Sequence, residues 1–237
     1  MAEGEKTGEQ SAPRRRLRVR PRHAASLVLL REGPAGIAVL MGRRGLSARF
    51  MPGYYVCPGG RVADDDRGRW RGETGEPRGG AALLRQARAA LRETYEETGI
   101  LVGRRESTPP CPSGGLPGAA ASFPVEAAYA AHGIAPDLRL LTYIGRAITP
   151  TSSPMRFDTH FFLADGAYAT GDHADGTELD DVAWHDADPN ADRAMSGVTR
   201  FMLARALAVW HGDAAPAPLY RHIGKRAHVA PLRPARR

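Results

Sequence analysis

Residues 92–100 read Arg-Glu-Thr-Tyr-Glu-Glu-Thr-Gly-Ile and place three carboxylates within one helical turn. The run from Ala81 to Thr98 is rich in Ala, Leu, Arg, Gln and Glu, and Gly99 follows it, so the pattern predicts a helix that ends at Thr98. The glutamates therefore lie in its last turn, where the negative end of the helix dipole disfavours anions. These carboxylates therefore destabilise the end of the helix, so stability does not account for their placement.

The three carboxylates, Glu93, Glu96 and Glu97, share one helix face because residues three and four apart are neighbours on a helix. At roughly 4 Å and an effective dielectric near 20, two carboxylates repel by about 4 kcal/mol, and a hard cation such as Mg²⁺ or Mn²⁺ turns this repulsion into coordination. The alternative is a solvated acidic helix end with Arg92 as countercharge. For an arbitrary Glu-rich turn, that alternative is favoured by about three to one.

The position of this turn along the chain favours the metal hypothesis. It lies downstream of Pro58-Gly59-Gly60-Arg61-Val62, and the two segments together resemble the Nudix box, the signature of the Nudix hydrolases. The family pattern is Gly, five residues, Glu, seven residues, then Arg-Glu-aliphatic-any-Glu-Glu-any-Gly-aliphatic. At average residue usage, Arg-Glu-x-x-Glu-Glu-x-Gly starts by chance at about one position in a million.

Two features depart from that pattern. Gly60 and Arg92 lie further apart than the family spacing, so residues 64–80 are interpreted as an insertion, and the first Glu of the box has no clear counterpart. The run of three aspartates at residues 64–66 offers stand-ins. Thr94 also replaces the usual aliphatic residue.

A second segment, residues 40–60, is similar to the element that precedes the box in Nudix enzymes acting on coenzyme A. Arg44, Arg49 and Gly53 fall in register with it, whereas Cys57 stands where Phe is usual. Arginines form bidentate, charge-assisted hydrogen bonds with phosphate, so the chemistry of Arg43, Arg44 and Arg49 suits a phosphorylated ligand, and Arg44 and Arg49 are the candidate substrate contacts. The alternative for each is an Arg-rich surface loop.

Residues 156–162 resemble a stretch of the Nudix branch that cleaves CoA and its esters, and that branch also carries an insertion inside its box. The phenylalanines of this segment are typical of a half-buried strand. Arg156 and Asp158 are the positions to test in this segment, and Arg156 is the candidate substrate contact.

The resemblance implies a role for each residue of the site. The implied ligands of Mg²⁺ or Mn²⁺ are Glu93, Glu96, Glu97 and the Gly59 carbonyl. The implied catalytic residues are Glu93 and Arg92, and Arg92 orients a glutamate. The implied substrate contacts are Arg44, Arg49, Arg156 and Gly60.

The general base varies among relatives of such enzymes. Glu178, just before a predicted strand at residues 182–184, is the best candidate outside the box. The alternative is a solvent-facing acid, because Asp175, Asp180 and Asp181 surround it in the sequence.

The resemblance implies an α/β fold, the Nudix α/β/α sandwich with a mixed β-sheet between helices. Hydrophobic periodicity agrees with it. The predicted strands are 25–30, 37–41, 138–148, 159–164 and 182–184, and the predicted helices are 81–98, 126–134 and 198–210. We expect a basic N-terminal tail at 1–21, the Nudix domain at 22–212, and a basic, Pro-containing C-terminal tail at 213–237 that is mobile and solvated.

Composition limits the other functional classes. No stretch approaches a membrane span, and Cys57 and Cys111 are too few for a disulfide framework or a cysteine zinc site, so we expect a soluble, cytoplasmic protein. The net charge of +7 is concentrated near the ends of the chain. Basic arms bind nucleic acid non-specifically, but without interleaved aromatics the solvated alternative is favoured by about three to one.

The implied reaction is hydrolysis of a diphosphate by metal-activated water, with coenzyme A or an acyl-CoA as the first substrate hypothesis. Nucleotide sugars, dinucleotides such as NADH, ADP-ribose, and nucleoside triphosphates form the second. A non-catalytic Nudix-fold ligand sensor or nucleic-acid-binding regulator is the third, although the intact Arg92, Glu93, Glu96 and Glu97 set argues against it. The sequence leaves a homodimer open.

Overall fold

A mixed β-sheet forms the centre of the molecule in the computed structural model, which describes residues 19–105, 124–224 and 226–232. Strands β1 and β9 pair in parallel, as do β8 and β12, whereas the other neighbours are antiparallel. Across the sheet the order is β11 (Leu179–Asp186), β2 (Gly36–Arg44), β1 (Arg22–Gly33), β9 (Phe157–Asp165), β8 (Thr142–Ile148), β12 (Pro218–Ile223) and β13 (Arg226–Pro231).

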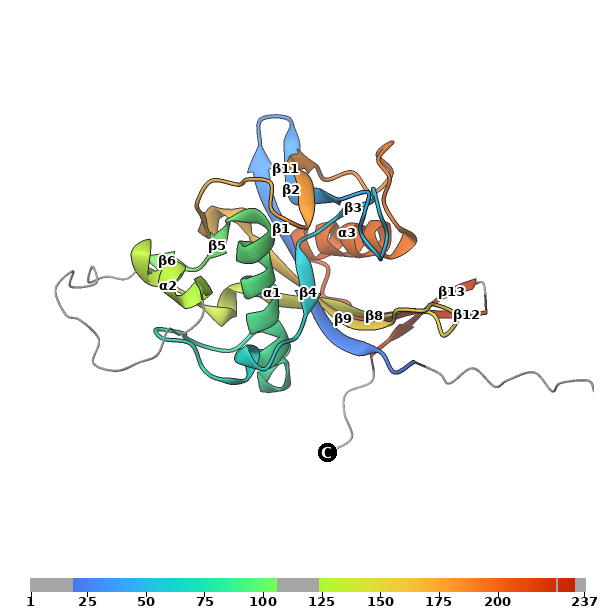
Figure 1. Ribbon diagram of the computed structural model, residues 1–237, viewed down its shortest axis with the longest axis horizontal. Helices are drawn as coiled ribbons and strands as arrows, with labels where there is room; N and C mark the ends of the chain where they lie inside the picture. The colour runs from blue at the N-terminus through green and yellow to red at the C-terminus, as the bar shows by residue number, and fades with distance from the viewer. Residues whose placement is uncertain (1–18, 106–123, 225, 233–237) are drawn as a thin grey trace, which may run out of the picture.

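Helices cover both faces of this sheet, with α1 (Leu84–Thr98) on one side and α3 (Gly197–Trp210) on the other (Figure 1). Successive side chains of a strand point to opposite faces. Leu27 and Leu29 of β1 accordingly pack in the core that contains α1, whereas Val28 and Leu30 pack in the core that contains α3. The expected α/β/α sandwich with a mixed sheet is confirmed.

Shorter elements connect these layers. Strand β3 (Tyr55–Val56) pairs with β2, and β4 (Gly59–Arg61) pairs with β1, which brings the glycine loop beside the centre of the sheet. The remaining elements are β5 (Leu101–Val102), β6 (Arg104–Arg105), α2 (Pro124–Ala131), β7 (Ile134–Ala135) and β10 (Ala169–Thr170), with 3-10 turns at Asp65–Arg67, Ala81–Leu83, Leu138–Leu140 and Gly166–Tyr168.

Most predicted elements are present, with shifted ends. The helix predicted from Ala81 begins as a 3-10 turn and becomes α-helical at Leu84. The strand predicted from Leu138 begins only at Thr142, because Leu138–Leu140 forms a 3-10 turn capped by Asp137. Asp137 accepts a hydrogen bond from the Arg139 N–H at 3.1 Å, a local contact that competes with extended structure.

The prediction that residues 213–237 form a mobile tail is wrong for β12 and β13. Strand β12 joins the main sheet through parallel pairing with β8, and Tyr220 packs its ring 5.1 Å from that of Phe201 in α3. Basic residues interrupt the apolar alternation of these strands, so their composition resembles that of a solvated tail. Pro218 stands at the first residue of β12, where proline is tolerated in a sheet.

Several expectations lie wholly or partly outside the described residues. Residues 1–18 of the predicted N-terminal tail and Cys111 are among them. Cys57 is buried in the core beside α3, as expected for a residue in a Phe position. Within the described part of the chain, no helix has the length and apolar character needed to cross a membrane.

Candidate active site

The acidic turn lies at the C-terminal end of α1, as predicted. Gly99 ends the helix in the left-handed conformation, at φ 76°, and its N–H donates to the Tyr95 carbonyl at 2.8 Å. Glycine adopts this conformation without the cost that a Cβ imposes. Because α1 packs against β4, Glu93 and Glu97 of the turn face the glycine loop.

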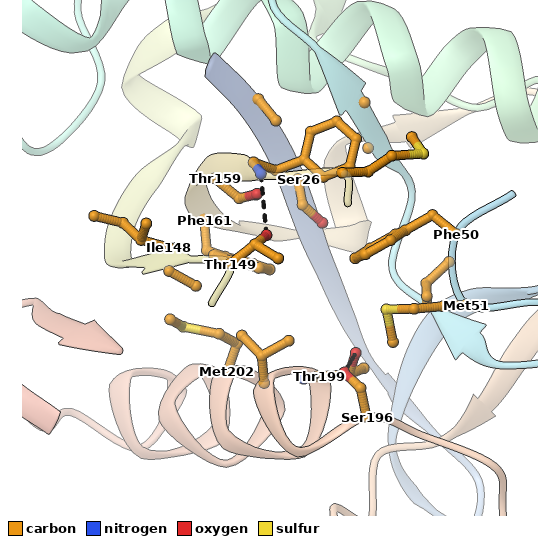
Figure 2. Close-up of a pocket in the computed structure, with 18 of the residues that line it drawn as sticks. Ser26, Phe50, Met51, Ile148, Thr149, Thr159, Phe161, Ser196, Thr199 and Met202 are labelled. Atoms are coloured by element: carbon orange, nitrogen blue, oxygen red, sulfur yellow. Dashed lines mark hydrogen bonds between the residues drawn. The ribbon is translucent and has the colours of Figure 1, made fainter. Parts of the chain in front are cut away.

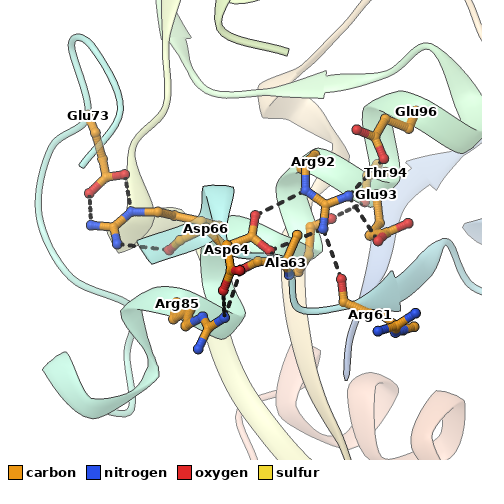
Figure 3. Close-up of polar contacts among 12 residues, drawn as sticks. Arg61, Ala63, Asp64, Asp66, Glu73, Arg85, Arg92, Glu93, Thr94 and Glu96 are labelled. Atoms are coloured by element: carbon orange, nitrogen blue, oxygen red, sulfur yellow. Dashed lines mark hydrogen bonds and ion pairs between the residues drawn. The ribbon is translucent and has the colours of Figure 1, made fainter. Parts of the chain in front are cut away.

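Arg92 organises the turn through all five of its N–H groups (Figure 3). Its Nη1 donates to Glu93 at 2.9 Å and to Glu96 at 2.8 Å, and its Nη2 donates to the Arg61 carbonyl at 2.9 Å. Asp66 accepts from Nε at 3.0 Å and from Nη2 at 3.1 Å. A buried guanidinium with every donor used holds its partners in fixed positions.

Glu97 is a buried carboxyl group, and Glu93 is largely buried, with 15% of its side chain exposed. Burial raises the pKa of Glu93 to about 7, although Arg92 opposes the shift, and burial raises the pKa of Glu97 to about 8, although a hydrogen bond from the Gly59 N–H at 2.8 Å opposes it. Repulsion from Glu96 and Glu178 raises the pKa of Glu93 further, and repulsion from Glu93 and Glu178 raises the pKa of Glu97 further. Glu96 is more open, with 42% of its side chain exposed.

The glycines of β4 leave room for these carboxylates. A Cβ at Gly60 would lie 2.4 Å from Oε2 of Glu93, so only glycine fits there without moving that side chain. A Cβ at Gly59 would lie 2.4 Å from the Ala25 carbonyl oxygen, which belongs to the backbone of β1. The two glycines therefore serve different contacts, one with the acidic turn and one with the sheet.

The expectation that all three carboxylates converge on one point is not met as the side chains stand. Glu93 and Glu96 share Arg92, whereas Glu97 turns to Gly59, and no group of three His, Cys, Asp or Glu side chains among the described residues forms a ready metal cage. The donor chemistry nevertheless fits Mg²⁺ or Mn²⁺, which prefer carboxylate and carbonyl oxygens. Two buried carboxyls with raised pKa values are the groups that a divalent cation would stabilise in the ionised form.

A cavity of about 670 Å³ opens beside this turn, within the usual range for small-molecule sites. Glu93, Gly59 and Gly60 contribute to its wall, together with Arg44 at the end of β2 and Arg49 in the loop that follows. Glu96 and Glu97 do not line it; Glu97 is buried behind Gly59. The structure thus brings the predicted arginines and Glu93 to one cavity.

Glu178, the proposed general base, also lines this cavity. Oε2 of Glu178 lies 3.8 Å from Nη2 of Arg44, and 64% of the side chain is exposed. Its negative charge contributes to the raised pKa of both Glu93 and Glu97. Glu178 is therefore both solvent-accessible and close to the candidate site.

Arg156 stands between two residues that line the cavity, Met155 and Phe157, but is not itself part of the wall. Its Nη1 donates to the Val19 carbonyl at 2.7 Å and its Nε to the Thr149 carbonyl at 3.2 Å, and the residue does not line the cavity. Asp158 is buried and accepts from Nε of Arg146 at 2.6 Å. Both residues hold parts of the protein together, so neither is kept in the substrate set that we propose.

The insertion is folded against the N-terminal half of α1 (Figure 3). Glu73 is 4% exposed and accepts from Nε of Arg88 at 2.7 Å and from Nη2 at 2.8 Å. Arg88 lies one helical turn before Arg92, and Trp70 of the same segment is buried. The insertion therefore brings Asp66 to Arg92 and fixes it there.

Sequence reasoning missed the apolar half of the cavity. Its side chains come from the loop before β3, the ends of β8 and β9, and the first turns of α3 (Figure 2). No short motif connects these segments, because they meet only in the folded sheet. Clusters of methionine and phenylalanine such as Phe50-Met51 were the available signal.

Comparisons with known proteins agree with this geometry. No protein-family model matches the chain, and no curated protein matches it. Among solved structures, the Nudix hydrolase from Alicyclobacillus acidocaldarius is 32% identical over 80% of this chain and 92% of its own, with a TM-score of 0.62. The MutT protein from Bacillus halodurans is 13% identical over 90% of this chain and 99% of its own, with a TM-score of 0.50, and shows a similar fold alone. By its identity to the first of these proteins, the chain belongs to the Nudix hydrolase family.

Proposed function

We propose that this Nudix hydrolase is a divalent-metal-dependent diphosphatase that acts on coenzyme A or acyl-CoA. The observation that carries the proposal is the shared cavity, in which Arg44 and Arg49 lie with Glu93, the glycine loop and Glu178. Anionic phosphates fit such a wall, because guanidinium groups bind them bidentately.

The residues that would hold the metal are Glu93, Glu96 and Glu97, with the Gly59 carbonyl. When bound, a divalent cation lowers the pKa of a water molecule and neutralises charge on the phosphoryl oxygens. Arg92 is a positioning residue in this account, since its bonds to Glu93 and Glu96 restrict both side chains.

Glu178 is the proposed general base. Its exposed carboxylate borders the cavity and is able to accept a proton from a water molecule that attacks phosphorus. Attack on phosphorus breaks the P–O–P bond of the substrate. One phosphate then leaves with the adenosine part and the other with the pantetheine part. The Arg44 guanidinium, with Nη2 3.8 Å from Oε2 of Glu178, places a positive charge beside that carboxylate.

A turnover panel tests the proposal. Purified protein with Mg²⁺ or Mn²⁺ is given CoA, acetyl-CoA, NADH, ADP-ribose, ADP-glucose and nucleoside triphosphates. We expect the highest kcat/KM with the CoA compounds, and losses on the order of 100-fold or more in Glu93→Gln and Glu178→Gln. Glu32→Gln, an exposed acid in β1 that does not line the cavity, is the matched control.

Preference for another diphosphate would overturn the CoA assignment and keep the diphosphatase. Metal binding without turnover on any member of the panel would favour the ligand sensor instead.

A further inference from the structure

The part of the cavity formed with α3 is largely apolar, and we call it the apolar arm (Figure 2). It is continuous with the part that contains Glu93, since one cavity includes both. The labelled side chains surround an open space between the loop before β3 and the helix. Its principal apolar side chains are Phe50, Met51, Ile148, Met155, Phe161 and Met202.

Several hydroxyl groups of the arm are already used by the protein. Ser26 Oγ donates to the Pro58 carbonyl at 3.0 Å. Thr149 Oγ1 accepts from the Phe157 N–H at 3.0 Å, the dashed line that ends at Thr149 in Figure 2. Ser196 Oγ caps the first turn of α3. A nucleobase carries many donors and acceptors, and each one left without a partner after it leaves water is unfavourable. A flexible apolar chain has no such requirement.

The wall opposite α3 is held in shape before any ligand arrives. Nε of Arg44 donates to the Phe50 carbonyl at 2.9 Å, and the Phe50 ring contacts that of Phe157 edge-on at 5.3 Å. Met51 has a φ of 52°, a left-handed conformation that is uncommon for residues other than glycine. Such conformations persist where the surrounding structure imposes them, and here it places Met51 on the cavity wall.

From these observations we propose that the apolar arm binds the acyl-bearing side of the substrate, so that the enzyme prefers acyl-CoA with a longer acyl chain to free CoA. The proposal rests on the diphosphatase function proposed above. Burial of each methylene group strengthens binding by up to roughly fourfold, so affinity should rise with chain length until the arm is full.

Two measurements test the arm. The first is kcat/KM with Mg²⁺ for CoA, acetyl-CoA, butanoyl-CoA and octanoyl-CoA. The second is the Kd of the same ligands by calorimetry in EDTA, which reports binding whether or not turnover occurs. We expect kcat/KM to be about tenfold or more higher for octanoyl-CoA than for CoA, and its Kd to be about tenfold or more lower, because several methylene groups enter the arm.

Met51→Asn is the informative variant. Asparagine tolerates the left-handed conformation, so the backbone is kept while a polar amide enters the arm. We expect this variant to raise the Kd of octanoyl-CoA by about tenfold and that of CoA by less than about twofold. Leu46→Asn, in the same loop and 85% exposed without lining the cavity, is the matched control and should change neither ligand.

The outcomes separate this proposal from the one on which it rests. Equal Kd values for CoA and octanoyl-CoA, or equal weakening of both by Met51→Asn, would overturn the acyl assignment even if CoA is cleaved. Cleavage of ADP-ribose or NADH in preference to every CoA compound, without affinity for octanoyl-CoA in EDTA, would overturn both. Affinity that rises with chain length would support the arm even if turnover is absent.

Discussion

Asp66 is fully buried and accepts two hydrogen bonds from the guanidinium of Arg92, at 3.0 and 3.1 Å. Of the three aspartates that the sequence offered as stand-ins for the missing box Glu, only this one meets the arginine. Asp64 pairs with Arg67 and Arg85 at the surface, and Asp65 is exposed. The insertion therefore supplies a carboxylate to the acidic turn from an unusual position in the chain.

Asp66→Asn should lower the affinity for Mg²⁺ or Mn²⁺ and the turnover number by about 10–100-fold, because partners that orient metal ligands have effects of that size. Removal of a buried charge partner should also cost about 3 kcal/mol of stability. Metal titration by calorimetry and urea denaturation measure the two effects. Asp65→Asn is the control, and equal behaviour of the two variants would refute the positioning role.

Gly60→Ala and Gly59→Ala should separate activity from stability. The Cβ at residue 60 meets the end of the Glu93 side chain, which is able to move, so we expect at least a roughly tenfold loss of kcat with a nearly normal Tm. The Cβ at residue 59 meets the backbone of β1, so we expect about 2–3 kcal/mol of destabilisation. Gly68→Ala, where a Cβ finds open space, is the control. A loss of stability in Gly60→Ala together with a loss of kcat alone in Gly59→Ala would contradict the geometry.

Arg49→Ala should raise KM for CoA by about tenfold and leave kcat within about twofold, because a phosphate contact made equally in the ground and transition states changes binding alone. Arg43→Ala is the matched control, since Arg43 is an exposed neighbour that does not line the cavity. Steady-state kinetics of both variants decide the point. Equal changes in the two variants would indicate a general effect of charge.

The stability of the metal-free protein should fall as pH rises from about 4.5 to about 8. In the folded state burial raises the pKa of Glu93 to about 7 and that of Glu97 to about 8, from 4.5, so the folded state binds more protons than the unfolded state across this window. The stability linked to these groups is complete below the unfolded pKa and is lost as pH rises through the folded values. Divalent metal should restore it most at pH 8.

Thermal denaturation with EDTA and with Mg²⁺, from pH 5 to pH 8.5, measures this dependence. The Glu93→Gln and Glu97→Gln double variant isolates the contribution of the two groups and should show a flatter profile. A wild-type profile that matches that of the double variant would show that these carboxyls do not titrate in this range.

Local signals in the sequence were sufficient to predict α1 and much of the sheet. Gly99 ends α1 as its residue type predicts, and the hairpin of β1 and β2 follows its glycine turn. The resemblance indicated Arg44 as a substrate contact and Glu178 as a candidate base, and both residues line one cavity in the structure. Propensity, periodicity and motif spacing act over short distances along the chain, and these elements depend on them.

Contacts between segments that are distant in the sequence could not be predicted from local patterns. The choice of Asp66 over its neighbours depends on the fold of the insertion, which Glu73 and Arg88 hold together across 15 positions. Strand β12 was missed because its pairing with β8 compensates for weak alternation. The hydrogen bond from Arg156 to the Val19 carbonyl, 137 positions away, has no local signal either. In each case tertiary contacts decide what the local pattern leaves open.

The most direct test of the central claim is hydrolysis of CoA in ¹⁸O-labelled water with Mg²⁺ or Mn²⁺, followed by mass spectrometry of the products. Attack of water on phosphorus predicts phosphopantetheine and adenosine 3′,5′-bisphosphate with one ¹⁸O in one of their phosphates, and no product in EDTA or with Glu97→Gln. Absence of labelled phosphate from every diphosphate tested, or an unchanged rate in Glu97→Gln, would contradict the account.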